Sequence, residues 1–145
     1  MVDFQFWPDV PAEIRLALGP LMHRWAYLLP GWCHWVRIYY EPSDDGSIKN
    51  TAEPEYRGVR LTVCADWLHG TAERRNELIV HEFLHVPLAP MVHLAKELIH
   101  SLVADEKTRD VLNEQWRLAF EGAVCDLERI VLGQEPLPPS NMVPV

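Results

Sequence analysis

The sequence predicts an α+β protein in which helices pack on a small antiparallel sheet. Two segments, 34–41 and 56–65, have the β-branched and aromatic content or the alternation of apolar and polar positions that is typical of strands. The second half of the chain instead has apolar positions at helical spacing. With 145 residues the chain is long enough for one domain with a sizeable core, which we expect over residues 1–133.

A helix is expected near the N-terminus, over about residues 11–29. Asp9 and Pro11 are favourable residues for a helix start, and the apolar positions that follow recur every third or fourth residue. Gly19–Pro20 indicates a kink or a break within this helix, and Pro30–Gly31 ends it.

Two strands are expected next. HWVRIYYE (34–41) is β-branched and aromatic, and YRGVRLTVCA (56–65) alternates with a period of two. The segment between them, PSDDGSIKNTAEPE (42–55), is polar and rich in turn residues. The simplest arrangement is an antiparallel hairpin that lies on a helix.

Three helices are expected in the second half of the chain. The first begins after Thr71, a good N-cap, and ends near Val86, because the residue before Pro87 is disfavoured in the helical region. Two further helices are expected over 91–102 and 106–132.

The last twelve residues, QEPLPPSNMVPV (134–145), are rich in proline, and we expect this tail to be extended or disordered.

Composition excludes several classes of protein. The net charge of −8 argues against a nucleic-acid-binding surface, which needs a basic patch. We find no run of about 18 apolar residues and therefore expect no membrane span. The N-terminus lacks the pattern of a signal peptide. The cysteines, Cys33, Cys64 and Cys125, are odd in number and scattered, which indicates free thiols in a reducing compartment. A cytoplasmic location is therefore expected.

The stretch NELIVHEFLHVP (76–87) contains the pattern H-E-x-x-H on a predicted helix. His81 and His85 are one helical turn apart, so their imidazoles can share one tetrahedral metal ion. Glu82 lies about 100° round the helix from His81, a position that suits a general base better than a third ligand. A shuffled chain of this composition contains the pattern with a probability of only ~3%.

A third protein ligand is less clear from the residues alone. A histidine six positions after His85 would complete one common zinc pattern, but that position is Met91, and His93 and His100 are off that spacing. The acids of the last helix are the remaining candidates. Its broad apolar stripe, which predicts the face toward the core, comprises Leu112, Trp116, Ala119, Phe120, Ala123, Leu127 and Ile130.

Glu114, Glu121 and Glu128 share the polar side of this helix, where a solvated acidic face is the simplest interpretation. Glu121, however, borders small residues that would let another helix approach closely. Asp126 lies at the edge of the apolar stripe. Periodicity leaves Glu121 and Asp126 as alternative ligands.

The chain resembles a minimal gluzincin, a zincin-like metallopeptidase core of the small type encoded by phages and prophages. HEFLH carries the resemblance, together with FEGAVCDLERI, which is similar to the E-x-x-V-x-x-L pattern of such proteins. The resemblance implies Glu121 as the third zinc ligand, with Val124 and Leu127 as packing residues. It also implies that a strand, which we expect to be 56–65, presents an edge to an extended substrate.

We therefore expect a zinc peptidase in which His81, His85 and Glu121 bind Zn²⁺ and Glu82 activates water for hydrolysis of a peptide bond. The alternatives are a catalytically silent zinc-bound module that binds or regulates a partner, and a hydrolase of a non-peptide bond. The remaining expectations concern supporting residues: His93, His100 or Tyr56 could stabilise the oxyanion, and Glu77 or Glu97 could orient a ligand histidine.

Overall fold

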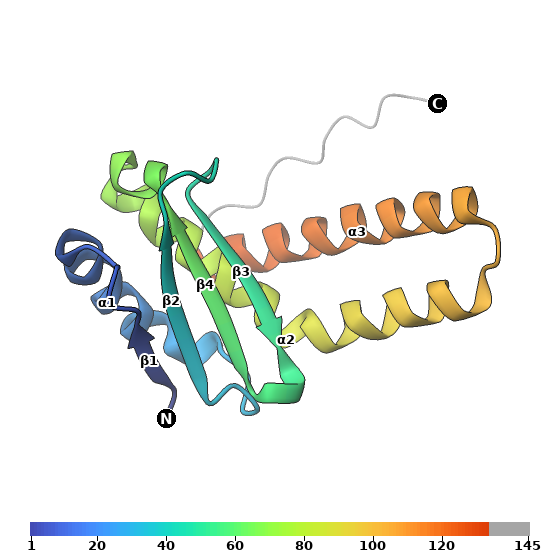
Figure 1. Ribbon diagram of the computed structural model, residues 1–145, viewed down its shortest axis with the longest axis horizontal. Coiled ribbons are helices and arrows are strands. Elements are labelled where there is room, and N and C mark those ends of the chain that lie inside the picture. The colour runs from blue at the N-terminus through green and yellow to red at the C-terminus, as the bar shows by residue number, and fades with distance from the viewer. Residues whose placement is uncertain (134–145) are drawn as a thin grey trace.

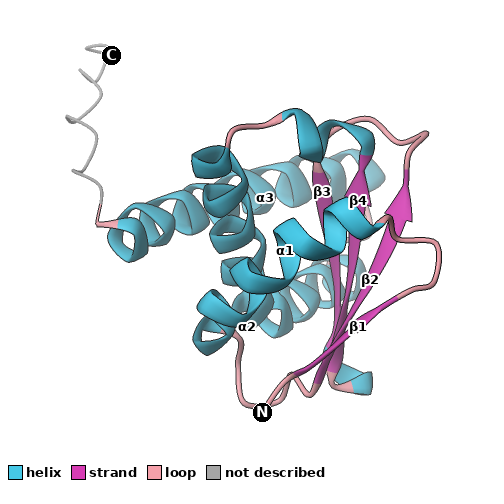
Figure 2. Ribbon diagram, turned by 90° about the vertical axis from the view of Figure 1, so that its left-hand side faces the viewer, coloured by secondary structure: helices cyan, strands magenta, loops and turns pink. Residues whose placement is uncertain are grey.

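The computed structural model describes residues 1–133, so the predicted tail, 134–145, lies outside the described residues. The protein has two layers, a four-stranded sheet and helices packed on one of its faces (Figures 1 and 2). The α+β class predicted from the sequence is confirmed. In chain order the elements are β1 (Asp3–Phe6), α1 (Ala12–Trp25), β2 (Trp35–Glu41), β3 (Ile48–Glu53), β4 (Gly58–Cys64), α2 (Ala72–Leu102) and α3 (Glu106–Leu132).

The sheet is mixed and has the order β1-β2-β4-β3. β1, β2 and β4 are parallel, with Val36 opposite Val59, and β3 runs antiparallel to β4 at the edge. The predicted antiparallel hairpin of 34–41 and 56–65 is therefore wrong. Residues 42–55 are not simply a connection: they include β3, which reverses the chain so that β4 can run in the same direction as β2.

Two strands were not predicted because both are short and weakly patterned. β1 has only four residues, and β3 has a single buried side chain, Ile48, among mostly polar neighbours. Each is defined by its pairing with a longer strand, a long-range interaction that the local sequence does not show.

The core lies between the sheet and the helices. Ile14, Leu18 and Met22 of α1 are fully buried there, as are Val36 and Leu61 of the central strands. α1 continues through Pro20 and ends at Trp25, followed by a short 3₁₀ turn. The indole nitrogen of Trp25 donates a hydrogen bond to Oδ1 of Asn76 at 2.7 Å, which ties α1 to α2.

α2 is one helix of 31 residues, where the sequence predicts two helices separated by a break after Val86. The predicted start is confirmed, because the Thr71 hydroxyl accepts a hydrogen bond from the Arg74 amide. The predicted break is wrong. Val86 and Ala89 are buried on either side of Pro87, so packing against the rest of the protein holds the helix together across its prolines.

α3 has the predicted bounds, with an Asp105 N-cap and Gly133 in the left-handed conformation (φ 67°) at its end. Its rotation differs from the prediction. Val124 is its one fully buried residue, whereas much of the apolar stripe, including Ala119, Ala123 and Ile130, is exposed. α3 packs antiparallel against α2, and the two form a hairpin that extends beyond the sheet (Figure 1). The face of α3 that meets α2 carries acids as well as apolar side chains, which periodicity of apolar residues cannot reveal.

By length and composition α2 is apolar enough to cross a membrane, a property that the core helix of a globular protein also has. Here it packs against the sheet, α1 and α3. The expectation that no segment spans a membrane stays a prediction.

Candidate metal centre

Two imidazoles of α2 meet at the interface with α3. His81 and His85 are one turn apart and half-buried, as the H-E-x-x-H spacing predicts. Their Nε2 atoms are 3.1 Å apart, and the rings meet edge to face. Both nitrogens therefore point to the same place.

Glu121 of α3 faces this pair. Its Oε1 lies 3.2 Å from Nε2 of His85, and its Oε2 lies 3.5 Å from Nε2 of His81. Ligand atoms of a tetrahedral ion with bonds of about 2.0–2.1 Å stand about 3.3 Å apart. The donor atoms of His81, His85 and Glu121 thus have the separations and chemistry of three ligands to one metal ion.

His81 has a second partner on α3. Its Nδ1 lies 2.9 Å from Oε2 of Glu128, whose side chain is only 16% exposed. Donation from Nδ1–H to this carboxylate selects the tautomer whose Nε2 lone pair faces Glu121. The sequence pattern predicts a solvated acid at Glu128. Its spacing of seven residues from Glu121, which places both on one side of α3, is the signal that could have identified it.

Cys125 lies beside this contact. Its thiol, the Glu128 carboxylate and a His81 nitrogen form a second group of potential donors within 4.8 Å of one another. Burial raises the pKa of the Cys125 thiol, and the neighbouring carboxylates of Glu128 and Glu121 raise it further. The thiol form is thereby favoured over the thiolate that metals bind. The geometry therefore favours the group of His81, His85 and Glu121.

Glu82 lies next to the histidines but faces the sheet. Its carboxylate and its backbone carbonyl both accept hydrogen bonds from the side-chain amide of Asn50 on β3. Burial raises the pKa of Glu82, while the Asn50 hydrogen bond acts in the opposite direction. Asn50 lies in the polar, turn-rich segment 42–55, and no local pattern identifies it as a functional residue.

Burial also lowers the pKa of His85, and the nearby Glu121 carboxylate partly offsets this effect. A lowered pKa keeps the imidazole neutral at physiological pH, which is the form that binds a metal ion.

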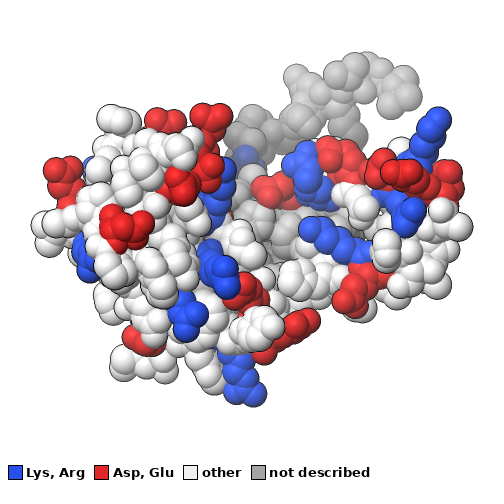
Figure 3. Space-filling model, viewed as in Figure 1, with Lys and Arg blue, Asp and Glu red and all other residues white. Residues whose placement is uncertain are grey.

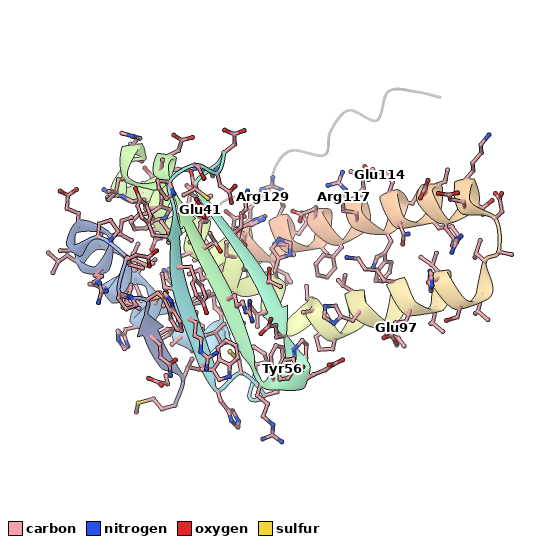
Figure 4. The ribbon with its side chains drawn as sticks, in the orientation of Figure 1. Glu41, Tyr56, Glu97, Glu114, Arg117 and Arg129 are labelled. Carbon is pink, nitrogen blue, oxygen red and sulfur yellow. The ribbon has the colours of Figure 1, made fainter. Side chains whose placement is uncertain are left out.

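The structure separates the alternatives on α3. The Asp126 side chain is 76% exposed and pairs with Arg129, so it does not reach the histidines. Glu114 pairs with Arg117 on the outer side of α3, as a solvated acidic face predicts (Figure 4). Of the three acids spaced seven apart, the two nearer the C-terminus contact the histidines.

The supporting residues expected from the sequence lie at different distances from this centre. Glu97 is exposed and points away from α3 (Figure 4), and Glu77 pairs with Arg74 one turn away. The carboxylate that lies beside Nδ1 of His81 is that of Glu128.

The residues considered for the oxyanion also differ in position. His100 lies near the turn between α2 and α3, where it contacts Arg109, and Tyr56 is exposed beyond the end of β3. His93 lines the same cavity as His85.

Two cavities flank the centre. One, of about 280 Å³, lies between β3 and α2, and the other, of about 390 Å³, lies between α2 and α3. His85 and Phe120 line both, so the candidate metal centre opens on two sides. Comparisons with protein-family models, with curated proteins and with solved structures gave no match for this chain.

Proposed function

We propose that this protein is a zinc-dependent peptidase. The observation that carries the proposal is the convergence of two imidazole nitrogens and one carboxylate, which lie 3.1–3.5 Å apart, beside a half-buried glutamate, Glu82, that is not part of this set. Three protein ligands of these types leave a fourth position open, as in catalytic rather than structural zinc sites. The same three donors support zinc as the ion, since imidazole and carboxylate both suit it.

When bound, the ion would act as a Lewis acid for a carbonyl oxygen and would lower the pKa of a water molecule. Glu82 accepts the proton of the attacking water and delivers it to the leaving nitrogen. Asn50 holds the Glu82 carboxylate in place, and Glu128 holds the His81 ring. Positioning and proton transfer thus come from three separate elements: β3, α2 and α3.

The substrate is a peptide, for which the sheet offers a binding edge. β4 is paired on both sides, so the segment 56–65, expected to bind substrate, has no free edge. β3 is the outer strand on the side of the candidate centre, and no described strand pairs with its outer edge. An extended peptide that pairs with β3 would pass beside Glu82, because Asn50 of that strand contacts it.

Elemental analysis of purified protein tests the metal centre first. We expect about one zinc per chain in the wild type and in Asp126→Ala, and none in Glu121→Ala. Glu82→Gln should keep its zinc and lose hydrolysis of a mixed peptide library, detected by mass spectrometry. Equal hydrolysis by wild type and Glu82→Gln, or a wild type that binds zinc and cleaves nothing, would contradict a peptidase and favour the non-catalytic module.

A further inference from the structure

The cavity between β3 and α2 has an unbalanced charge. Its lining comes from Asn50, Thr51 and Ala52 of β3, from five residues of α2 and from Phe120. Apart from the candidate ligand His85, its ionisable residues are His93 and Lys96, and no carboxylate lines it.

Lys96 has no counter-ion among the described residues. The residues one helical turn away from it are Val92, His93, Ile99 and His100, so α2 supplies no acid to pair with it. Lys96 lines two cavities, and in the one beside β3 the protein supplies no carboxylate to pair with it.

The charges of the neighbouring hollows are different. The lining of the cavity between α2 and α3 includes three acids, Asp110, Glu114 and Glu121, beside Lys96 and Arg117, and Glu114 is paired with Arg117. In a smaller hollow beyond His93, Glu53 is paired with Arg60 and Glu55 is exposed. On the face drawn in Figure 3, basic side chains are interspersed with acids and form no continuous patch. Unlike these two hollows, the cavity beside β3 has basic side chains in its lining and no carboxylate.

We propose that this cavity holds a carboxylate of the bound peptide, with Lys96 as its counter-charge. The inference rests on the proposed peptidase function and specifies its substrate class: peptides with an acidic group near the scissile bond. Lys96 is eleven residues after His85, about 16 Å along the helix axis, which an extended peptide covers in about five residues.

The side of the scissile bond follows from the direction of β3. Glu82 lies beside Asn50, and His93 shares a hollow with Ala52 and Glu53, so Lys96 lies toward the C-terminal end of this strand. Antiparallel pairing is the more stable kind, and a peptide antiparallel to β3 has its N-terminal part at that end. The acidic group is then a side chain on the N-terminal side of the bond. A parallel peptide would instead bring its C-terminal part there.

A random peptide library, prepared with free and with amidated C-termini, tests this inference on the zinc-loaded wild type. We expect Asp and Glu to be enriched about threefold within five positions on the N-terminal side of the cleaved bond, in both preparations and less so at high salt. Lys96→Glu should exchange this preference for Lys and Arg. Lys107→Glu, which changes an exposed lysine that lines none of these cavities, should retain the preference of the wild type.

The outcomes separate this inference from the peptidase itself. Cleavage with no acidic preference, or with the same preference in Lys96→Glu, overturns the inference and leaves the peptidase. Enrichment only with free C-termini identifies the carboxylate as the C-terminus of a parallel peptide. Fluorescence anisotropy of zinc-loaded Glu82→Gln with labelled hexapeptide pools, fixed as Glu or as Gln at one position, supplies a readout without hydrolysis. Tighter binding of the Glu pool that Lys96→Glu abolishes supports the carboxylate site even if no peptide is cleaved.

Discussion

The two ring nitrogens of His81 have different partners, and this difference makes Glu128 as relevant to the centre as the ligands are. Nε2 faces His85 and Glu121, while Nδ1 faces Glu128 at 2.9 Å. A carboxylate that accepts the Nδ1 proton fixes the ring orientation and makes Nε2 a better donor to a metal ion. The rigid position of Glu128 on α3, with its side chain largely buried, suits this role.

Glu128→Ala should weaken zinc binding by about 10- to 100-fold, because the His81 ring loses both its orientation and its electrostatic partner. The zinc Kd can be measured by competition with a chromophoric chelator. Glu114→Ala is the matched control, since it removes a carboxylate from the exposed side of the same helix. A Kd in Glu128→Ala equal to that of the control would show that His81 needs no partner at Nδ1.

Asn50→Ala should leave the zinc content unchanged and lower peptide hydrolysis about tenfold, the size expected for one hydrogen bond to a charged group. The reason is that Asn50 contacts the Glu82 carboxylate and none of the candidate ligands. Combining the change with Glu82→Gln provides the control, because the two losses should not add when they act through the same group. Additive losses would place the role of Asn50 elsewhere.

At the scale of single elements, α2 departs most from its local sequence. Pro87 and Pro90 each lack the amide proton that an interior helical residue donates, yet the helix continues through both. Val86 and Ala89 are buried beside them, so tertiary packing outweighs a local preference. Because α2 is continuous, His81 of the candidate centre and Lys96, at the far end of the cavity beside β3, lie on the same helix.

Pro90→Ala should raise the free energy of unfolding by about 1–3 kcal/mol, because an amide at this exposed position can donate to the Val86 carbonyl. Urea denaturation of the two proteins measures the difference. Pro42→Ala, in the turn after β2, should instead be neutral or slightly destabilising, since proline restricts the unfolded chain there. No gain from Pro90→Ala would indicate that α2 needs its proline bend to pack against α3.

Strands and helices differed in how far the sequence could predict them. β2, β4 and α3 have strong local patterns and were predicted to within a few residues. The sequence does not predict β3, because its residues are mostly polar. Without β3 the chain has no reversal between β2 and β4, so their parallel pairing is not predicted either. The cause is physical: an edge strand is defined by the strand it pairs with, and its own side chains need not be apolar.

At the scale of the whole molecule, the sequence predicts the H-E-x-x-H site because both histidines and the glutamate lie within five consecutive residues of one helix. The sequence does not predict the rotation of α3 about its own axis. The apolar stripe predicts one face toward the core, whereas the helix places Glu121, Val124 and Glu128 toward α2. The resemblance to gluzincins implies Glu121 as the third metal ligand, whereas periodicity alone leaves Glu121 and Asp126 as alternatives. Asn50 could not be found without the fold, since β3 brings it to Glu82 from a distant part of the chain.

The same rotation ties the stability of α3 to the candidate centre. α3 contributes one fully buried residue, Val124, to the core, and its contacts are chiefly with α2. A metal ion held by two ligands on α2 and one on α3 would therefore cross-link the helix with the smallest share of the core. Ligand binding stabilises the native state, and here the increase in stability against local unfolding should be largest in α3.

Removal of zinc with a chelator should consequently increase amide hydrogen exchange in α3 more than in the sheet, where Val36, Leu61 and Val63 are fully buried and independent of the metal. Exchange followed by mass spectrometry, with and without chelator, gives the comparison peptide by peptide. Glu121→Ala supplies the control: its α3 should exchange rapidly in both conditions, because the link between the helices is already absent. A uniform rise across sheet and helices would mean that the centre stabilises the protein as one cooperative unit, and unchanged exchange in α3 would mean that no metal ion joins it to α2.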